Sequence, residues 1–317
     1  MKKIILGKTG LEVTELCFGA LNMGPLQKNL SVEEGSEIIA HGLKSGINFI
    51  DTAQIYKTYP HIRLAMEQTG IKPIISTKSP AASYEDMEVA INDALVSMDI
   101  KEIDIFFLHA ARVTKKVFEE REGAFRCLMD YREKGILKSI GISTHVVEVV
   151  ETAAANPEVD MVFPIINKIA MGVLGGSRED MEKAIELCHN SNQGILIMKA
   201  LAGGNTVDRY KESMDYIMDF SKSRFSIALG MLNKAEVDMN IKYINGEDIS
   251  KELAENPMEK KIFQVVPMLC IKCQKCIEVC HSDAVTGDAN TPAKITDKCI
   301  KCGYCVDTCP QFAIRMV

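Results

Sequence analysis

The 317-residue sequence has no tryptophan, no excess of positive charge and no long apolar run near its N-terminus. Its formal net charge is −6, so no global basic field exists to attract nucleic acid or an acidic membrane. The opening MKKIILGKTG contains an apolar run of only three residues, too short for a signal peptide or a membrane span. These absences exclude nucleic acid and membranes as expected partners and predict a cytoplasmic protein.

Cysteine, by contrast, is abundant and unevenly distributed. Of the 11 cysteines, three are scattered through the first 240 residues and eight lie between Cys270 and Cys309. A disulfide framework requires an oxidising compartment, and the sequence carries no export signal. The clustering therefore favours metal or iron–sulfur ligation.

The first 245 residues alternate apolar runs with helical patterns. Parallel strands that are covered on both faces are apolar without clean alternation. Eight runs fit that description: 15–20, 47–51, 73–77, 103–109, 137–143, 159–165, 194–200 and 225–230. Helical patterns separate them, one opened by a capping box of Ser31 with Glu34, one opened by Ser83, and others over 117–134, 146–154, 178–190, 208–221 and 234–243.

This alternation predicts an α/β fold, a (β/α)8 TIM barrel over residues 1–245. A doubly wound open sheet is the alternative, but no GxGxxG motif follows the first strand-like run. Residues 246–266 are charged and are expected to form a linker or helix. Residues 267–317 are expected to form a small C-terminal α+β domain.

That domain contains an internal repeat, CIKCQKCIEVC (270–280) and CIKCGYCVDTC (299–309). Each copy has the spacing C-x2-C-x2-C-x3-C, in which three cysteines hold one 4Fe–4S cluster and the fourth ligates the other cluster. The spacing predicts one cluster on Cys270, Cys273, Cys276 and Cys309, and a second on Cys299, Cys302, Cys305 and Cys280. Zinc is the alternative, although structural zinc sites favour two separated C-x2-C pairs.

Over about fifty residues this segment resembles bacterial two-cluster ferredoxins. The second copy ends in Cys309-Pro310, as that family does, whereas the first ends in Cys280-His281. The missing proline removes no ligand but is expected to alter the turn beside the cluster that Cys280 holds.

Polar residues occur where strand-like runs of the barrel end, and this is the face where barrel enzymes place catalytic groups. Asp51, Lys78 and His109 stand at such ends, and Tyr56 follows Asp51 in a loop. A carbonyl that accepts hydride needs a proton, which tyrosine delivers more readily if a nearby lysine lowers its pKa. Asp51 would keep Lys78 charged and oriented, and His109 would polarise the carbonyl oxygen.

The segments NFIDTAQIY (48–56), STK (76–78) and IDIFFLH (103–109) resemble signatures of the aldo/keto reductase superfamily, as does the opening ILGKTGLEVTELCFGALNMG. The resemblance covers roughly residues 1–245 and implies a barrel that binds a nicotinamide cofactor across its strand ends and reduces carbonyls. It assigns catalysis to Asp51, Tyr56, Lys78 and His109. A subfamily carries a C-terminal ferredoxin module, and MKALAGG (198–204) is similar to its seventh-strand segment.

The same resemblance implies a set of cofactor-binding residues: Gly19, Ala20, Asp51, Ser143, Thr144, Asn167, Lys234, Glu236 and Asn240. Two positions depart from the family, with Phe163 where glutamine is usual and Leu232 where an arginine for a 2′-phosphate is expected. Lys234 is then the nearest cation, which leaves three alternatives: NADP, NAD, or loss of nicotinamide binding. His145, near Ser143, is a further candidate for ligand contact because loops on this face carry function.

The two halves pose a redox conflict, since nicotinamide transfers two electrons as hydride and a cluster transfers one at a time. A flavin usually couples the two, and no flavin motif is evident. The leading hypothesis is an iron–sulfur oxidoreductase that reduces a small carbonyl substrate with NAD(P)H and relays electrons to or from a redox partner protein. One alternative is an NAD(P)H carbonyl reductase with structural or sensory clusters. Another is a non-enzymatic electron-carrier subunit.

Overall fold

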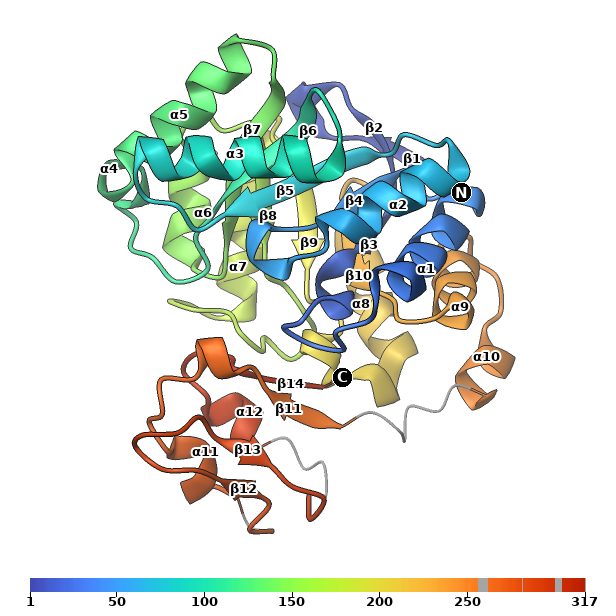
Figure 1. Ribbon diagram of the computed structural model, residues 1–317, viewed down its shortest axis with the longest axis vertical. Coiled ribbons are helices and arrows are strands. Elements are labelled where there is room, and N and C mark those ends of the chain that lie inside the picture. The colour runs from blue at the N-terminus through green and yellow to red at the C-terminus, as the bar shows by residue number, and fades with distance from the viewer. Residues whose placement is uncertain (256–261, 281, 300–303, 317) are drawn as a thin grey trace.

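The computed structural model describes residues 1–255, 262–280, 282–299 and 304–316, and it consists of a large barrel and a small C-terminal module (Figure 1). Eight parallel strands close the barrel in the order β10-β3-β4-β5-β6-β7-β8-β9. They are β3 (Leu16–Gly19), β4 (Phe49–Asp51), β5 (Ile74–Ser79), β6 (Ile103–His109), β7 (Leu137–Thr144), β8 (Met161–Pro164), β9 (Gly194–Met198) and β10 (Ser226–Gly230). The predicted TIM barrel is thus confirmed, and the open sheet is wrong.

Neighbouring residues of a strand point to opposite sides, so each strand supplies two apolar layers. In β6, Phe106 packs outward in the layer between strands and helices, while Phe107 packs inside the barrel with Phe49 and Phe163. Because both faces of every strand are covered, the strands are apolar without alternation. A short antiparallel hairpin, β1 (Lys3–Ile5) with β2 (Glu12–Thr14), precedes the barrel.

Helices surround the strands: α1 (Val32–Lys44), α2 (Tyr59–Thr69), α3 (Tyr84–Met98), α4 (Val117–Glu120), α5 (Glu122–Glu133), α6 (Val147–Ala154), α7 (Arg178–Asn190), α8 (Tyr210–Ser221) and α9 (Lys234–Ile244). The capping box of Ser31 with Glu34 is present, and Ser83 accepts a hydrogen bond from the Asp86 amide. Two differences from expectation stand out. The range 117–134 is broken at Arg121, and α2 had been given no range.

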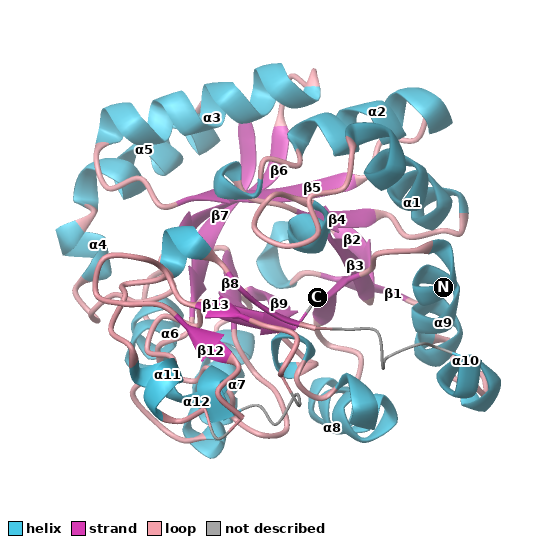
Figure 2. Cartoon of the chain, turned by 60° about the horizontal axis from the view of Figure 1, so that its bottom comes forward, coloured by secondary structure: helices cyan, strands magenta, loops and turns pink. Residues whose placement is uncertain are grey.

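The C-terminal module contains two small sheets, β11 (Phe263–Val265) with β14 (Ile314–Met316) and β12 (Val285–Thr286) with β13 (Lys294–Ile295). Two short helices, α11 (Lys275–Glu278) and α12 (Tyr304–Thr308), complete it. The range 246–266, expected as a linker or helix, contains α10 (Ser250–Glu255). It also contains β11, which belongs to the module's sheet because it pairs with β14. In Figure 2 the module stands in front of one side of the barrel's open end.

The module is seated on the carboxyl ends of the barrel strands, the face where the catalytic candidates lie. Val266 is buried in a cluster with Leu26, Ala53 and Tyr56 of the barrel, and Leu269 packs against that cluster. Strand β14 contacts η4 (Ala202–Gly204), the turn that follows β9. The two parts are therefore joined through the mouth of the barrel.

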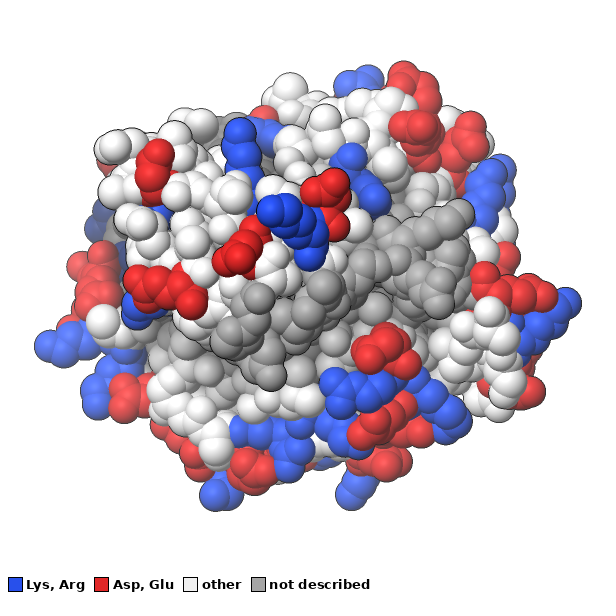
Figure 3. Space-filling view, turned by 90° about the horizontal axis from the view of Figure 1, so that it is seen from below, with Lys and Arg blue, Asp and Glu red and all other residues white. Residues whose placement is uncertain are grey.

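The surface seen from the module's side carries acidic and basic side chains interspersed around its rim (Figure 3). This mixture agrees with the modest net charge of −6. Within the described parts of the chain, no helix is long and apolar enough to cross a membrane.

Candidate active site and cluster cavity

The structure brings the four catalytic candidates, Asp51, Tyr56, Lys78 and His109, to the mouth of the barrel. Asp51 ends β4, Lys78 lies near the end of β5, and His109 ends β6. Tyr56 closes η3 (Gln54–Tyr56), the turn that leaves β4. Gly19 pairs in register with Asp51 at the end of β3, and Ala20 is buried immediately after it. Parallel register thus gathers residues that are distant in sequence at one edge.

Asp51 and Lys78 form a buried ion pair, with exposed fractions of 4% and 1%. Lys78 Nζ donates hydrogen bonds to Asp51 Oδ1 at 2.8 Å, to Asp51 Oδ2 at 2.7 Å and to the Thr52 carbonyl at 2.8 Å. These three bonds use all three donors of the ammonium. Burial by itself would lower the pKa of Lys78, but Asp51 and Tyr56 together raise it. Lys78 therefore remains charged beneath the site.

Tyr56 stacks over this charge together with Phe163. Lys78 Nζ lies 4.9 Å from the ring centroid of Tyr56 and 4.9 Å from that of Phe163. Phe163, which replaces the family's glutamine, thus supplies a ring face to the ammonium. Lys78 lowers the pKa of Tyr56, as expected from the sequence, but it is not the largest influence on that pKa. Burial raises the pKa of Tyr56 more than Lys78 lowers it, so the phenol stays protonated as a proton donor.

His109 faces Tyr56 edge-on, with ring centroids 6.2 Å apart and an interplanar angle of 89°. Burial, then Lys78, Lys199 and Arg121, lowers the pKa of His109 to about 3. Its Nδ1 is buried and has no hydrogen-bond partner among the described residues. His109 is therefore a neutral imidazole that can donate one hydrogen bond to a ligand.

The neutrality of His109 predicts a pH dependence of stability. An unfolded histidine has a pKa near 6.5 and the folded group about 3, so as pH falls the unfolded state binds a proton first. The stabilisation is complete above pH ~6.5 and is lost as pH falls toward ~3, with about 2 kcal/mol lost by pH ~5. His109→Gln should reduce the loss of unfolding free energy between pH ~6.5 and pH ~5, measured by urea unfolding at both pH values. An equal loss of unfolding free energy in the variant and the wild type would contradict the prediction. Burial also lowers the pKa of His145, so His145 should contribute to the pH dependence that remains.

The cofactor-binding candidates near the nicotinamide end lie close to His109. Ser143 is buried and pairs in register with His109 across β6 and β7. Thr144 follows it and is fully buried. Asn167 uses its side-chain amide to bond the backbone N–H and carbonyl of Met171, both at 2.9 Å, and so shapes the loop after β8. The neutral imidazole and Ser143 fit a carboxamide-bearing ring at this edge.

The candidates at the adenosine end lie on α9, apart from the catalytic group. Glu236 accepts a hydrogen bond from the Leu232 amide at 2.9 Å, and Asn240 accepts one from the Tyr210 hydroxyl at 2.6 Å. Lys234, expected to replace the missing arginine, lies 3.5 Å from Glu37. The fit to a 2′-phosphate is therefore weaker than the fit to a nicotinamide ring.

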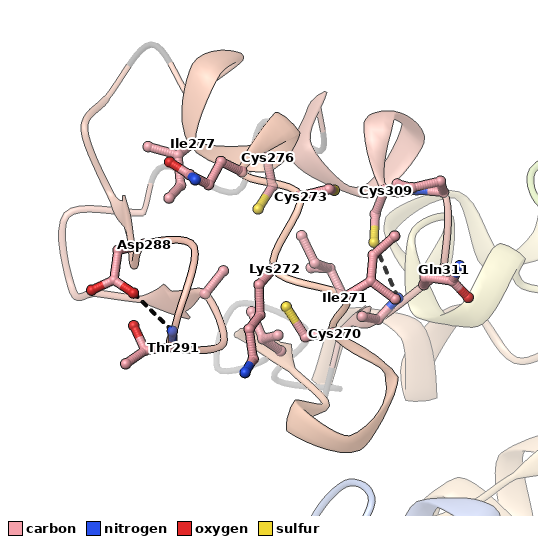
Figure 4. Close-up of a pocket in the computed structure, with 16 residues that line it drawn as sticks. Cys270, Ile271, Lys272, Cys273, Cys276, Ile277, Asp288, Thr291, Cys309 and Gln311 are labelled. Carbon is pink, nitrogen blue, oxygen red and sulfur yellow. Dashed lines mark hydrogen bonds between the residues drawn. The ribbon is translucent and has the colours of Figure 1, made fainter.

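The module holds a cavity lined by sulfur (Figure 4). Cys270, Cys273 and Cys276 of the first copy and Cys309 of the second all line it. The structure thus brings together the four residues assigned to one cluster. Cys309 Sγ accepts a hydrogen bond from the amide four residues along at 3.3 Å, and Cys280 Sγ accepts the equivalent bond at 3.3 Å, so the two copies share this turn.

Part of the second predicted cluster lies outside the described residues. Cys302 and His281 are in that position, whereas Cys280, Cys299 and Cys305 are described. Within the described chain no three His, Cys, Asp or Glu side chains are arranged to hold a single metal ion. The thiolates of a 4Fe–4S cluster bind different irons and need not converge on one point.

Three cations at the mouth of the barrel were not expected from the sequence: Lys199 after β9, Arg112 after β6 and Arg315 in β14. One signal existed, since Arg315 is the lone charge in the apolar run FAIRMV. His145, which had been singled out, lies among them with its Nε2 3.2 Å from Lys199 Nζ.

Comparison with known proteins places this geometry in a family. The family model described as "Aldo/keto reductase family" matches residues 15–260, and "4Fe-4S dicluster domain" matches residues 262–310. The chain belongs to the aldo/keto reductase family. Within this family of oxidoreductases, it carries a 4Fe–4S dicluster domain behind the barrel.

Relatives within the aldo/keto reductase family are distant. A protein of Glycine max named "Probable aldo-keto reductase 1" is 26% identical over 220 residues, which cover 64% of this chain and 60% of that protein. An NADPH-dependent alpha-keto amide reductase of Saccharomyces cerevisiae is 30% identical over 138 residues, which cover 40% of this chain and 44% of that protein. The chain thus spans three fifths or less of the length of these two curated relatives.

A solved structure, the holo form of aldo-keto reductase AKR11C1 from Bacillus halodurans, has a TM-score of 0.64 to this chain. The sequence identity is 16%, and the alignment covers 80% of this chain and 96% of that one. At this identity the likeness concerns the fold alone.

Proposed function

We propose that this chain reduces a carbonyl group of a small molecule with NAD(P)H, and that two 4Fe–4S clusters relay single electrons between the barrel's active site and a redox partner protein. The observation that carries the proposal is the seating of the module on the catalytic mouth. Val266 and Leu269 pack in the small hydrophobic group of side chains that contains Tyr56. Leu269 directly precedes Cys270 in the sequence. A ligand of one predicted cluster is thus next in sequence to a residue packed at the active site.

The barrel residues support the carbonyl chemistry. Bound NAD(P)H would supply a hydride to the carbonyl carbon. The Tyr56 hydroxyl gives its proton to the carbonyl oxygen, and the Lys78 ammonium stabilises the phenolate left behind. His109 would donate a hydrogen bond that polarises the carbonyl, and Ser143 would hold the carboxamide of the cofactor.

The module's contacts support the relay. Cys309 of the sulfur-lined cavity is followed by Phe312, whose ring centroid lies 5.7 Å from that of His145. The thiol of Cys309 also interacts electrostatically with Arg112 and Arg315 at the mouth. The cluster predicted on Cys270, Cys273, Cys276 and Cys309 is therefore the one that adjoins the barrel. Hydride from NAD(P)H supplies both electrons of a carbonyl reduction, so the relay would be a second route to the same product. On that route two electrons from the reduced clusters, collected on a flavin or taken up singly by the substrate, would replace the hydride.

The test is an anaerobic turnover experiment on the full chain, with iron content and an NAD(P)H titration measured on the same sample. The clusters are reduced first, a candidate carbonyl acceptor is added, and the visible cluster absorbance is followed. Recovery of that absorbance on adding the acceptor is expected.

Two matched variants sharpen this test, because each removes one predicted ligand from one cluster. Cys309→Ser removes a predicted ligand of the cluster that faces the barrel. The rate at which the acceptor reoxidises the clusters should fall about tenfold or more, because the electron must then reach the active site without that cluster. Cys299→Ser should lower that rate much less. Turnover without any cluster redox change would instead favour a carbonyl reductase with structural or sensory clusters. Absence of NAD(P)H binding would favour an electron-carrier subunit.

A further inference from the structure

We propose that Lys199 and Arg112 of the barrel, together with Arg315 of the module, form a binding site for a substrate carboxylate, so that the substrate is an oxo acid. The inference rests on the proposed carbonyl reduction for the identity of the reacting group. The anion site itself stands on the contacts described next.

The first element of the site is Lys199, the residue that follows β9. Its backbone has φ +58°, in the left-handed region that is unfavourable for a residue with a side chain. Lys199 Nζ lies 3.2 Å from Nε2 of His145, which is only 5% exposed. If Lys199 donates this hydrogen bond, His145 accepts it at Nε2 and carries its proton on Nδ1.

That Nδ1 atom is buried and has no hydrogen-bond partner among the described residues. A buried donor without an acceptor is costly and is rare in folded proteins. His145 therefore lacks an acceptor beside Lys199, and an oxygen of a bound anion is the kind of group that would satisfy it.

The second element is the ring of Phe312, which lies close to Arg112, Lys199 and His145. Arg112 Cζ lies 4.8 Å and Lys199 Nζ lies 5.5 Å from its centroid, and the His145 centroid lies 5.7 Å away. Cations gain from an aromatic face, but a ring carries no net charge and cannot neutralise them. The ring therefore leaves this positive charge in place. The groups that oppose it are the Cys309 thiol, for Arg112 and Arg315, and the Tyr56 hydroxyl, for Arg315.

The third element is Arg315, a half-buried side chain on β14. Its hydrogen bond is to the carbonyl of its own neighbour, Ile314, at 3.4 Å. Over the described residues, no carboxylate lies within 4.0 Å of Lys199, Arg112 or Arg315. The buried ammonium of Lys78, in contrast, has Asp51 at 2.7 Å.

Burial and like charge both act against the positive form of these groups. Burial, then Arg315 and Arg112, lowers the pKa of Lys199 well below its usual value. Burial also lowers the pKa of Arg315 to about 10. Like charges that lie close together in a partly buried site repel one another. An anion bound among them makes the net electrostatic interaction favourable.

The location selects the ligand. Arg112 follows β6, which ends in His109, Lys199 follows β9, and β14 contacts η4, so the site lies at the mouth of the barrel that also holds Tyr56 and His109. A carboxylate held here belongs to a molecule whose carbonyl lies at Tyr56. Arginine suits this role because its planar fork bonds both oxygens of a carboxylate.

The probes are oxamate, a non-reducible oxo acid analogue, and oxamide, its uncharged counterpart. Both are titrated calorimetrically into the full, cluster-loaded chain. Oxamate should bind the wild type, and Lys199→Met and Arg315→Leu should each weaken it about tenfold or more, the effect of losing one charge-assisted hydrogen bond. Arg315→Lys keeps the charge and loses the planar fork, so it should weaken oxamate binding less than Arg315→Leu does. Oxamide should bind weakly to all of them.

Matched controls are available within the chain. Lys222 is an exposed lysine whose backbone is also left-handed, at φ +48°, and it ends α8 at the opposite end of the barrel. Arg126 is exposed on α5, with its guanidinium 5.4 Å from the Tyr84 ring. Lys222→Met and Arg126→Leu should leave oxamate binding unchanged. Circular dichroism and iron content establish that each variant is folded and loaded.

Two results would overturn the proposal. If Lys199→Met and Arg315→Leu weaken NADP⁺ and spare oxamate, the site takes a cofactor phosphate. If they shift only the reduction potential of the clusters, the cations balance the charge of the cluster near Cys309. Because oxamate binding is measured without turnover, an inactive wild type that still binds oxamate would refute the proposed reaction and leave the anion site standing.

Discussion

Lys78→Met is expected to lower the free energy of unfolding by about 3–5 kcal/mol, because it leaves the Asp51 carboxylate buried without its partner. Asp51 is 4% exposed and accepts two bonds from Lys78 and one from Ser76 at 2.8 Å. Urea unfolding at neutral pH measures the change. The same variant should also lose carbonyl reduction, because no ammonium remains to stabilise the Tyr56 phenolate.

Two comparisons isolate the buried charge in that experiment. Lys138 bonds Glu102 at 2.7 Å and Asp104 at 2.9 Å on the surface, and Lys138→Met should cost no more than about 1 kcal/mol. Adding Asp51→Asn to Lys78→Met should recover much of the lost stability, since no unpaired carboxylate is then left. Equal losses in Lys78→Met and Lys138→Met would show that the pair is not the buried element described above.

Tyr56→Phe is expected to reduce kcat for carbonyl reduction by about 10²–10⁴-fold, the usual contribution of a positioned proton donor. The ring remains to pack against Lys78 and Val266, so the fold and the KM of the substrate should change little. Steady-state kinetics with NAD(P)H and an active carbonyl substrate provide the measurement.

The matched control is Tyr59→Phe. Tyr59 is also a buried tyrosine, 3% exposed, but its hydroxyl lies 2.8 Å from Thr77 Oγ1 on the outer side of β5. Losing that bond should cost about 1 kcal/mol of stability and leave kcat nearly unchanged. A Tyr56→Phe variant that kept its kcat would mean that another group donates the proton.

The periodicity of the barrel was readable because eight apolar runs stood between capped helices. The run 103–109 matches β6 residue for residue, and 178–190 matches α7. Local signals failed where a tertiary contact decides the outcome. Arg121 interrupts the helical pattern of 117–134, and its guanidinium reaches the His109 carbonyl at 3.1 Å, a contact that no helical period encodes.

For the catalytic candidates, too, one part could be predicted from local sequence and another part depends on tertiary contacts. Their positions followed from strand ends, because parallel register brings those ends to one face. The net direction of the Tyr56 pKa could not be predicted, because burial by Val266 and its neighbours outweighs the Lys78 charge and is not visible in a local motif. Asn167, expected at the cofactor, uses its amide to bond Met171 in the loop after β8.

The sequence by itself determined the barrel, the dicluster module and the residue types of the hydride-transfer group, because periodicity and cysteine spacing are local properties of the chain. Only the tertiary structure decided where the module sits, with Val266 and Leu269 packed beside Tyr56 at the mouth of the barrel. It also decided that Lys199, Arg112 and Arg315 meet at one mouth. These residues are far apart in sequence. The pKa and the interactions of a charged side chain depend on its burial and its neighbours, and only the folded structure determines both.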